Sequence, residues 1–228
     1  NFFRKIKIHV DKLKDNKEFL IENKLLDNIT SYYDYLKNVS FNDNLFLEGH
    51  FESEKYFLHE RQNILNEFNL VNHENFKKNV YLKNIQNGNV VSICIRQNRY
   101  SERIGNYNDQ ASIEKSQFFV KDTIKYIKKA ETLIEQKVSN PKYYIWSDNF
   151  TNLREYFPEN KYTFVINEEK KILNDFFLLL NCKYFIVGPT TFHWWGAWLS
   201  NFDNKFCIRP QNLNPSNNKD FWPTSWAS

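Results

Sequence analysis

Glycine-rich loops, metal-binding carboxylate pairs and long apolar runs are all missing from this chain. Its 228 residues include no Met and only 5 Gly, and these Gly form no phosphate-binding loop. Neither His-Glu-x-x-His nor Asp-x-Asp occurs, which disfavours a helix-borne zinc site and a metal held by such a carboxylate pair. No apolar run approaches the roughly 20 residues that a membrane-spanning helix needs, and the first residues lack the apolar core of a signal peptide. We therefore expect a globular chain without these classes of site.

Cysteine and histidine are too few and too scattered to define a redox or metal centre. The 3 Cys are an odd number without metal-type spacing, which argues against a disulfide framework and a zinc site. The 5 His form no recognisable triad with Ser or Cys. Cys94 falls inside an apolar run, where a thiol usually acts as a small hydrophobic group. A reducing cytoplasm is the expected compartment.

The charges of the two signs are nearly balanced. There are 31 basic and 27 acidic residues, with a net charge of +4 and a pI near 8.8. A surface this mixed disfavours nucleic acid as a partner. The mild positive excess suits an anionic small donor molecule, or transient contact with an acidic membrane surface. The predicted location is thus the cytoplasm, and peripheral contact with the inner face of the membrane stays open.

The sequence pattern changes near residue 89. Before that point the chain is charged and rich in Asn and Lys, and the turn cluster Gln86–Asn89 is the best candidate boundary. We predict a mostly helical domain over residues 1–89 and a second domain over residues 90–228. Three segments of the first part show periodicity, two of them helical and the last strand-like: Glu18–Leu36, Glu54–Phe68 and Asn44–Glu48.

From residue 90 onward, apolar strands alternate with helices. Such alternation with short connections predicts an α/β fold with a parallel sheet covered on both faces. Open sheets of this kind bind ligands at the carboxyl ends of their strands, so the residues after each strand are the site candidates. The expected elements, in order, are Val90–Ile95, Lys115–Lys137, Tyr143–Trp146, Thr151–Tyr156, Tyr162–Val165, Glu168–Leu180, Tyr184–Val187, Phe192–Leu199 and Lys205–Ile208.

Arg96 and Arg99 follow the first of these strands. A guanidinium at a strand end can clamp a diphosphate through two charge-assisted bonds, and can stabilise the charge that develops there during group transfer. Arg96 is accordingly a candidate for both donor binding and catalysis, and Arg99 for donor binding. The alternative is that Arg96 pairs with a structural carboxylate.

A second strand ends in Ser147 and Asp148, and both are donor-binding candidates. An ionised carboxylate only accepts hydrogen bonds, so Asp148 could accept from the base or ribose of a nucleotide. Asp148 could equally cap the helix that follows it, and the spacing alone does not separate these roles.

Thr190 and Thr191 follow a third strand and a Gly-Pro turn, at the start of a helix with three tryptophans. Backbone amides and hydroxyls at such a helix N-terminus can receive phosphate oxygens. His193 and Trp195 of the same helix are further donor-binding candidates. An ordinary threonine cap over a tryptophan-lined core accounts for part of the pattern, because three indoles are too large to lie at one site.

In this order, the three strand ends resemble the α-1,2-fucosyltransferases of glycosyltransferase family 11. Members carry a His-x-Arg-Arg-Gly-Asp-Tyr-like segment, a Ser-Asp-Asp-like strand end and an Asn-Ser-Ser-Phe-Ser-Trp-Trp-Gly-Ala-Trp-Leu-like segment. Phe192–Leu199 matches the last of these almost letter for letter. Leu47–Phe57 is similar to the family's Glu-Gly-Tyr-Phe-Gln-Ser-Glu-Lys-Tyr-Phe stretch, so the resemblance extends from about Leu47 to the C-terminal end.

The resemblance implies a GT-B-type fold, GDP-fucose as the donor, no metal or other cofactor, and an inverting displacement at the anomeric carbon of fucose. It implies that Arg96 binds the donor diphosphate, that Thr190 and Thr191 supply the hydroxyls of the third motif, and that Asp148 faces the nucleoside. Residues from about 90 onward would then form a Rossmann-like donor domain, and those before it the remnant of an acceptor domain.

Four positions depart from the first family motif. Its histidine, second arginine, glycine and aspartate are here Cys94, Gln97, Asn98 and Arg99. Arg99 is the residue that could restore the positive charge missing at Gln97. The family's Gly-Gly-Leu-Gly-Asn-Gln segment is absent, so we expect the chain to begin inside the first domain.

An inverting transfer to a hydroxyl benefits from a base that takes the acceptor's proton. Glu102 is the nearest carboxylate after Arg96 and the first candidate for this catalytic role, and Asp109 is the second. The alternative for Glu102 is a solvated loop residue.

The function predicted from the sequence is transfer of fucose from GDP-fucose to a galactose-type hydroxyl of a surface glycan, in α-1,2 linkage. The predicted partners are thus GDP-fucose and a glycan acceptor. Two alternatives stay open: a transferase that uses another nucleotide sugar, and an inactive domain that binds a nucleotide sugar.

Overall fold

The computed structural model describes residues 50–68, 78–102, 108–167, 172–214, 216 and 218–228, and the backbone of residues 18–21 and 45–48. The chain forms two compact units, which are residues 1–59 with 216–223, and residues 60–215 with 224–228. All candidate site residues belong to the second unit. The predicted domain boundary near residue 89 stays a prediction.

In the first unit, strands β1 (Glu18–Ile21) and β2 (Leu45–Glu48) pair in parallel. The strand-like prediction for Asn44–Glu48 is therefore confirmed at Leu45–Glu48. The helical prediction for Glu18–Leu36 is wrong at its start, because pairing with β2 satisfies backbone groups that a helix would bond internally. The remainder of that segment lies outside the described residues.

The helical prediction for Glu54–Phe68 is confirmed. Two short 3-10 helices, η2 (Glu54–Tyr56) and η3 (Leu58–Glu60), lead into helix α3 (Arg61–Glu67).

A five-stranded parallel sheet forms the centre of the second unit, with the strand order β5-β4-β3-β6-β7. This confirms the predicted α/β class with a Rossmann-like sheet, and each strand lies within one residue of its predicted bounds. The strands are β3 (Val90–Ile95), β4 (Lys142–Ser147), β5 (Tyr162–Phe164), β6 (Tyr184–Ile186) and β7 (Phe206–Ile208).

Helices connect these strands, as the alternating pattern predicts. The long helix begins at Gln110 rather than at Lys115, because the Asp109 carboxylate accepts a hydrogen bond from the Ser112 amide and caps it. Helix α5 (Leu82–Asn87) precedes β3, and the connecting helices are α6 (Gln110–Lys137), α7 (Leu153–Tyr156), α8 (Ile172–Leu180) and α9 (Thr191–Leu199).

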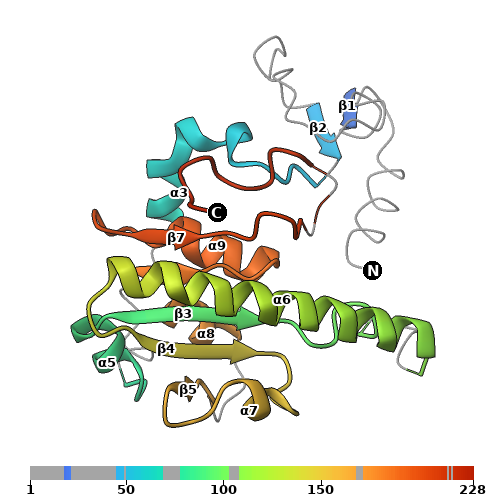
Figure 1. Ribbon diagram of the computed structural model, residues 1–228. Helices are drawn as coiled ribbons and strands as arrows, with labels where there is room; N and C mark the ends of the chain where they lie inside the picture. Colours follow the sequence, from blue (N-terminus) through green and yellow to red (C-terminus); the bar gives the residue numbers. More distant parts are fainter. Residues whose placement is uncertain are drawn as a thin grey trace. The chain divides into compact units, whose positions relative to one another are not determined.

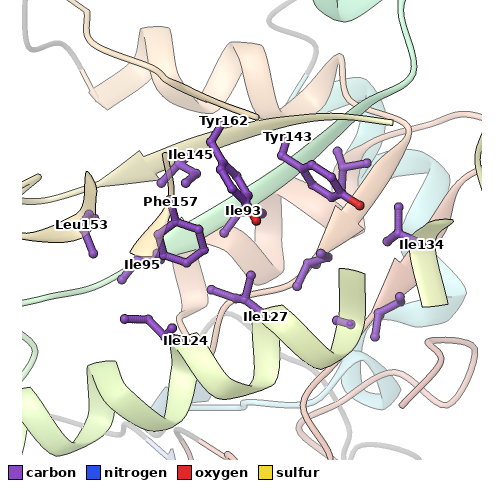
Figure 2. Packing of buried hydrophobic residues seen from close by; sticks show 14 of the residues in the cluster. Ile93, Ile95, Ile124, Ile127, Ile134, Tyr143, Ile145, Leu153, Phe157 and Tyr162 are labelled. Atoms are coloured by element: carbon purple, nitrogen blue, oxygen red, sulfur yellow. The ribbon is translucent and has the colours of Figure 1, made fainter. Parts of the chain in front are cut away.

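The core on one face of the sheet packs against α6, which runs alongside β3 in Figure 1. Ile93 of β3 and Ile145 of β4 are fully buried there against Ile127 of α6 (Figure 2). Side chains alternate along a strand, so Ser92 and Cys94 face the opposite layer, and Ser92 contacts His193 of α9. All six residues of β3 are buried, which is typical of a parallel strand covered on both faces.

Strand β3 is the point at which the strand order reverses. The chain continues from β3 to β4 and β5 on one side, and returns to β6 and β7 on the other. Because β3 and β6 are parallel neighbours, with Ile93 opposite Ile186, the residues that follow both strands lie at the same end of the sheet. Open sheets of this kind bind ligands at such a switch point.

Three further observations concern the described residues alone. Cys94, Cys182 and Cys207 are free and buried. None of the described helices is long and apolar enough to cross a membrane. The described His, Cys, Asp and Glu residues include no group of three or more arranged to hold a metal ion.

Candidate functional site

Gly188 brings the turn after β6 against the end of β3. A Cβ atom at this position would lie 2.2 Å from the carbonyl oxygen of Cys94, so only glycine allows the observed approach. The turn leads directly into α9, while β3 leads into Arg96. Residues 96–102, which follow β3 and contain Arg96 and Arg99, are called the arginine-bearing loop. Gly188 therefore sets the spacing between this loop and the N-terminus of α9.

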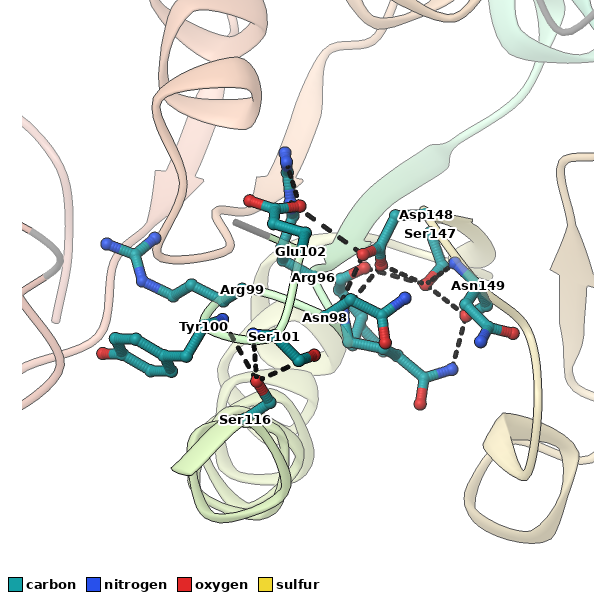
Figure 3. A network of polar contacts seen from close by, with 12 residues as sticks. Arg96, Asn98, Arg99, Tyr100, Ser101, Glu102, Ser116, Ser147, Asp148 and Asn149 are labelled. Atoms are coloured by element: carbon teal, nitrogen blue, oxygen red, sulfur yellow. Dashed lines mark hydrogen bonds and ion pairs between the residues drawn. The ribbon is translucent and has the colours of Figure 1, made fainter. Parts of the chain in front are cut away.

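Arg96 is held by a fork of two hydrogen bonds to Glu102. Its Nε and Nη2 atoms donate to Oε2 of Glu102 at 3.0 and 2.5 Å, and Nε lies 3.9 Å from an Asp148 oxygen (Figure 3). Arg96 is therefore paired with a carboxylate, which is the alternative that the sequence left open. The Arg96 side chain is 40% exposed, and Nη1 has no partner among the residues that the structure describes. One amino group of the guanidinium thus stays available to a ligand.

Asp148 holds the loop that carries these residues. Its Oδ1 accepts from the Gln97 amide at 2.7 Å, and its Oδ2 accepts from the Asn98 amide at 3.0 Å. Asp148 does not cap the following helix, since the N-cap of α7 is Asn152. Both carboxylate oxygens are therefore engaged by backbone, and contact with a nucleoside stays a prediction.

Ser147 fixes the neighbouring strand end. Its hydroxyl lies 2.8 Å from the Ile95 carbonyl oxygen and 2.6 Å from that of Asn149, both within hydrogen-bonding distance. This contact joins the ends of β3 and β4 and gives Ser147 a structural task beside its predicted donor-binding role.

Arg99 reaches the turn before α9. Its Nη1 donates to the Pro189 carbonyl oxygen at 3.2 Å, and the guanidinium lies 5.0 Å from the centre of the Phe119 ring. In Figure 3, Arg96 and Arg99 leave the loop in different directions. Behind them, the amides of Tyr100 and Ser101 donate to the Ser116 hydroxyl of α6, which anchors the loop. The two arginines of this loop therefore approach the strand ends from different sides.

The two threonines at the start of α9 differ in exposure. Thr190 is buried and its hydroxyl accepts from the His193 amide at 3.3 Å, which makes it the N-cap. Thr191 is exposed at the first helical position. The predicted cap is thus confirmed for Thr190, and Thr191 presents its hydroxyl at the positive end of the helix dipole.

The tryptophans of α9 form an aromatic cluster. The Trp194 and Trp198 rings stack with centres 6.0 Å apart, and both residues are buried. Trp195 is partly exposed and stacks on Phe68 of the loop after α3, 6.4 Å away. The tryptophan-lined core is therefore present, and Trp195 is the indole that is not fully enclosed.

Cationic side chains bind the C-terminal end of α9. Arg61 donates to the Trp198 carbonyl oxygen at 2.9 Å, and Lys205 donates to those of Ala197 and Ser200 at 2.8 and 2.7 Å. These bonds satisfy carbonyl groups left open at a helix end, where the negative end of the dipole favours cations. They fix the helix whose other end faces the arginine-bearing loop.

His193 lies inside the fold. It is fully buried, its Nδ1 accepts from the Gly188 amide at 2.8 Å, and its Nε2 lies 3.0 Å from the Ser92 hydroxyl. Because Nδ1 accepts, the ring proton belongs on Nε2, which donates to Ser92. Burial lowers the pKa of His193 to about 3. In this geometry the neutral ring stabilises the Gly188 turn through a hydrogen bond. Direct contact of His193 with a donor stays a prediction.

His193 makes stability depend on pH in a definite direction. In the unfolded chain the imidazole takes up a proton near its usual pKa of 6.5, whereas the folded state resists protonation down to about 3. Between these values the unfolded state binds more protons, so His193 lowers the free energy of unfolding as the pH falls, by at most about 1.4 kcal/mol per pH unit. Denaturant unfolding between pH 7.5 and 4.5 should show a smaller decrease for His193→Asn. The exposed His59→Asn variant should keep the wild-type slope, and equal slopes in all three proteins would contradict this role.

The two base candidates differ in their surroundings. Hydrogen bonds from Ser112 lower the pKa of Asp109, and this carboxylate is occupied as the cap of α6. Glu102 lies at the strand end, but its Oε2 already accepts two bonds from Arg96. Of the two, Glu102 is the carboxylate that belongs to the arginine-bearing loop.

Asp175 is a carboxylate near this end of the sheet that the local sequence pattern does not single out. It lies in the first turn of α8, is half-buried, and accepts a hydrogen bond from the Asn167 amide group. Burial raises its pKa. The sequence feature that could have pointed to Asp175 is an acidic residue at the start of the otherwise apolar stretch Asp175–Leu180.

These features define an α/β protein with a Rossmann-like sheet of the glycosyltransferase kind, in which cationic and hydroxyl groups meet at the switch point. The chain belongs to glycosyl transferase family 11, which it matches over residues 3–225. The resemblance seen in the sequence is thereby confirmed.

Two curated relatives from Escherichia coli bear glycosyltransferase names. The chain is 25% identical over 188 residues to Alpha-1,2-colitosyltransferase, covering 78% of this chain and 60% of the relative. It is 29% identical over 143 residues to O-antigen biosynthesis glycosyltransferase WbnK, covering 61% of this chain and 44% of the relative. The matched region is thus less than two thirds of either relative. No solved structure matches the chain significantly.

Proposed function

We propose that the protein containing this chain transfers fucose from GDP-fucose to a galactose-type hydroxyl of a surface glycan, forming an α-1,2 linkage with inversion and without a metal. The observation that supports this most is the position of Arg96, Arg99 and the N-terminus of α9 at the ends of two neighbouring strands, in a member of family 11. Work at the cytoplasmic face of a membrane, through peripheral contact, belongs to the same proposal.

The proposed reaction forms one bond and breaks another. The acceptor oxygen attacks the anomeric carbon of fucose, the bond from that carbon to the phosphate oxygen breaks, and GDP leaves with the electron pair. Negative charge therefore grows on the diphosphate. Arg96 receives it through Nη1, and Thr191 and the first amides of α9 receive it at the positive helix end.

The remaining predicted residues support this anion site. Asp148 and Ser147 fix the arginine-bearing loop, and Thr190 and His193 fix the start of α9. Arg99 adds positive charge beside the Pro189 turn. Trp195, being partly exposed, offers a flat apolar surface to the donor sugar.

Glu102 accepts the proton of the attacking hydroxyl. Its Oε2 is bound to Arg96 in the structure. When a diphosphate takes over bonds of the Arg96 guanidinium, the carboxylate loses donors and becomes a better acceptor. Binding of the donor and release of the base are thus linked through one ion pair.

A second candidate sugar is colitose, the 3-deoxy counterpart of fucose. It is favoured by the name of the relative that aligns with 78% of this chain. The two sugars differ in one hydroxyl group, so the phosphate site described above serves either donor equally.

Nucleotide binding to the full-length protein tests the proposal. In calorimetric titrations we expect GDP to bind at least about 10-fold more tightly than UDP or CMP, since a site that hydrogen-bonds one base rejects others by margins of this size or more. Transfer assays with GDP-fucose and GDP-colitose then identify the sugar. Tighter binding of UDP or CMP would contradict the proposed donor. GDP binding without transfer or donor hydrolysis would favour an inactive binding domain.

A further inference from the structure

The arginine-bearing loop contains a tight turn, and Arg96 and Glu102 meet at its base. The Glu102 amide donates to the Asn98 carbonyl oxygen at 2.8 Å, which closes the turn over residues 98–102. Arg96 precedes the turn and Glu102 ends it, and their side chains form the ion pair described above. Two features therefore fix the Glu102 carboxylate, which are its bonds to Arg96 and the backbone of the turn.

Ser116 of α6 holds the centre of this turn. Its Oγ accepts from the amides of Tyr100 at 3.1 Å and Ser101 at 3.2 Å. The hydroxyl donates in turn to the Ser112 carbonyl oxygen at 2.9 Å. A hydroxyl has one proton and two lone pairs, so these three bonds use it completely. Ser116 is only 2% exposed, and this one buried hydroxyl ties the two residues directly before Glu102 to the helix (Figure 3).

The beginning of the loop has a separate anchor. Asp148 accepts from the amides of Gln97 and Asn98, which directly follow Arg96. Arg96 itself is the first residue after β3, a strand that is buried along its whole length. Loss of the Ser116 hydroxyl should therefore leave Arg96 in place and release mainly the end of the turn that carries Glu102.

The two features that fix Glu102 do not act equally throughout the proposed reaction. When a diphosphate takes over bonds of the Arg96 guanidinium, Glu102 loses its side-chain partner at the stage at which it accepts the proton. We propose that Ser116 is a positioning residue, which holds Glu102 in place through the turn at this stage. The inference rests on the proposed function, because it concerns the base of that reaction. Misplacement of a reacting group by about 1 Å can reduce a rate about 10²-fold.

Replacing Ser116 by Ala in the full-length protein tests this role through a difference between turnover and binding. We expect kcat for sugar transfer to fall about 10-fold to 10²-fold, because the base is displaced rather than removed. Affinity for GDP, measured by calorimetry, should stay within about 2-fold of wild type, since the groups that meet the diphosphate keep their anchors. A loss of GDP affinity as large as the loss of kcat would contradict the proposal.

Conservative variants show whether the hydroxyl itself matters. Ser116→Thr keeps the hydroxyl and should keep kcat near that of wild type. Ser116→Cys offers a weaker acceptor to the two amides, so its kcat should lie between those of wild type and Ser116→Ala. The Cys variant also decides the question if Ser116→Ala does not fold, because a wild-type kcat in Ser116→Cys would then overturn the proposal.

A double-mutant cycle tests whether Ser116 acts through Glu102. Glu102→Ala removes the proposed base, so adding Ser116→Ala to it should lower kcat no further. Residues that act as one unit give losses that do not add, whereas independent residues give losses that do. Additive losses in the double variant would therefore overturn the proposed role.

Thr123 provides the matched control on the same helix. It is 1% exposed, and its hydroxyl donates to the Phe119 carbonyl oxygen at 2.7 Å, within α6 itself. Thr123→Val removes this buried hydroxyl with little change of shape and should leave kcat unchanged. An equal loss of kcat in Thr123→Val and Ser116→Ala would show that only the stability of the helix matters, which would overturn the proposal.

The outcomes separate this inference from the proposed function. Wild-type kcat in Ser116→Ala, in a protein whose turnover depends on Glu102, would overturn the role of Ser116 alone. Full turnover by Glu102→Ala would overturn the assigned base of the proposed function and, with it, the role of Ser116.

Discussion

Replacing Arg96 by Ala in the full-length protein should lower the rate of sugar transfer about 10²–10³-fold, the usual effect of removing one group that stabilises transition-state charge. The reason is the position of the guanidinium just after the end of β3, where Nη1 has no partner among the described residues. Affinity for GDP should fall as well, because the charge that Arg96 meets is present on the product. Steady-state transfer assays and GDP calorimetry measure the two effects.

Related variants show which property of Arg96 matters. Arg96→Lys keeps the charge but loses the planar fork, so we expect activity between those of wild type and Arg96→Ala. Arg154, which pairs with Glu159 at 2.7 Å on an exposed surface, provides the matched control, and Arg154→Ala should leave transfer unchanged. Undiminished turnover by Arg96→Ala would remove the basis of the proposed anion site.

Gly188→Ala should destabilise the fold by about 3 kcal/mol, the upper part of the range for overpacked sites. The added Cβ would lie 2.2 Å from the Cys94 carbonyl oxygen, which is backbone and cannot rotate away. The turn would have to move off β3, and the His193 bond to the Gly188 amide would be strained with it. Urea unfolding should therefore show a lower midpoint, and GDP should bind more weakly.

An exposed substitution outside the sheet provides the comparison. Gln211 lies in the loop after β7 and is exposed, so Gln211→Ala should leave the unfolding midpoint within experimental error. A Gly188→Ala protein as stable as wild type would show that the contact between the turn and β3 can relax, and that Gly188 does not set the spacing of the site.

The two predictions differ in how much of their basis could be seen in the sequence. Arg96 could be predicted because a strand that is buried on both faces consists of consecutive apolar residues, so its end is visible as the first charged side chain. The packing of Gly188 could not, because its contact is with the carbonyl group of Cys94, far earlier in the chain. A Gly-Pro pair shows a turn but not what the turn packs against.

The hydrogen-bond and ion-pair partners of Arg96 and Asp148 also could be predicted only in part from the sequence. The sequence left open whether Arg96 meets a ligand or a carboxylate, and the structure shows the pair with Glu102, while Nη1 has no partner in the part of the chain that the structure describes. For Asp148 the sequence offered a helix cap or a nucleoside contact, and neither describes the observed bonds to Gln97 and Asn98. Arg96 and Glu102 lie in one loop, whereas Asp148 follows β4 and its partners follow β3, so the partners of Asp148 depend on strand order rather than on local spacing.

By itself the sequence determined the family, the parallel α/β class, the positions of the five strands of the sheet and the three strand ends that carry the candidate site residues. Each of these depends on residues close together in the chain, such as the apolar run Val90–Ile95 or the motif Phe192–Leu199. Only the tertiary structure decided that His193 is buried, that Glu18–Ile21 pairs as a strand, and that Asp175 is bound by the Asn167 side chain. The reason is physical: burial, strand pairing and hydrogen-bond satisfaction are set by neighbours in space, which a local pattern of residue types does not specify.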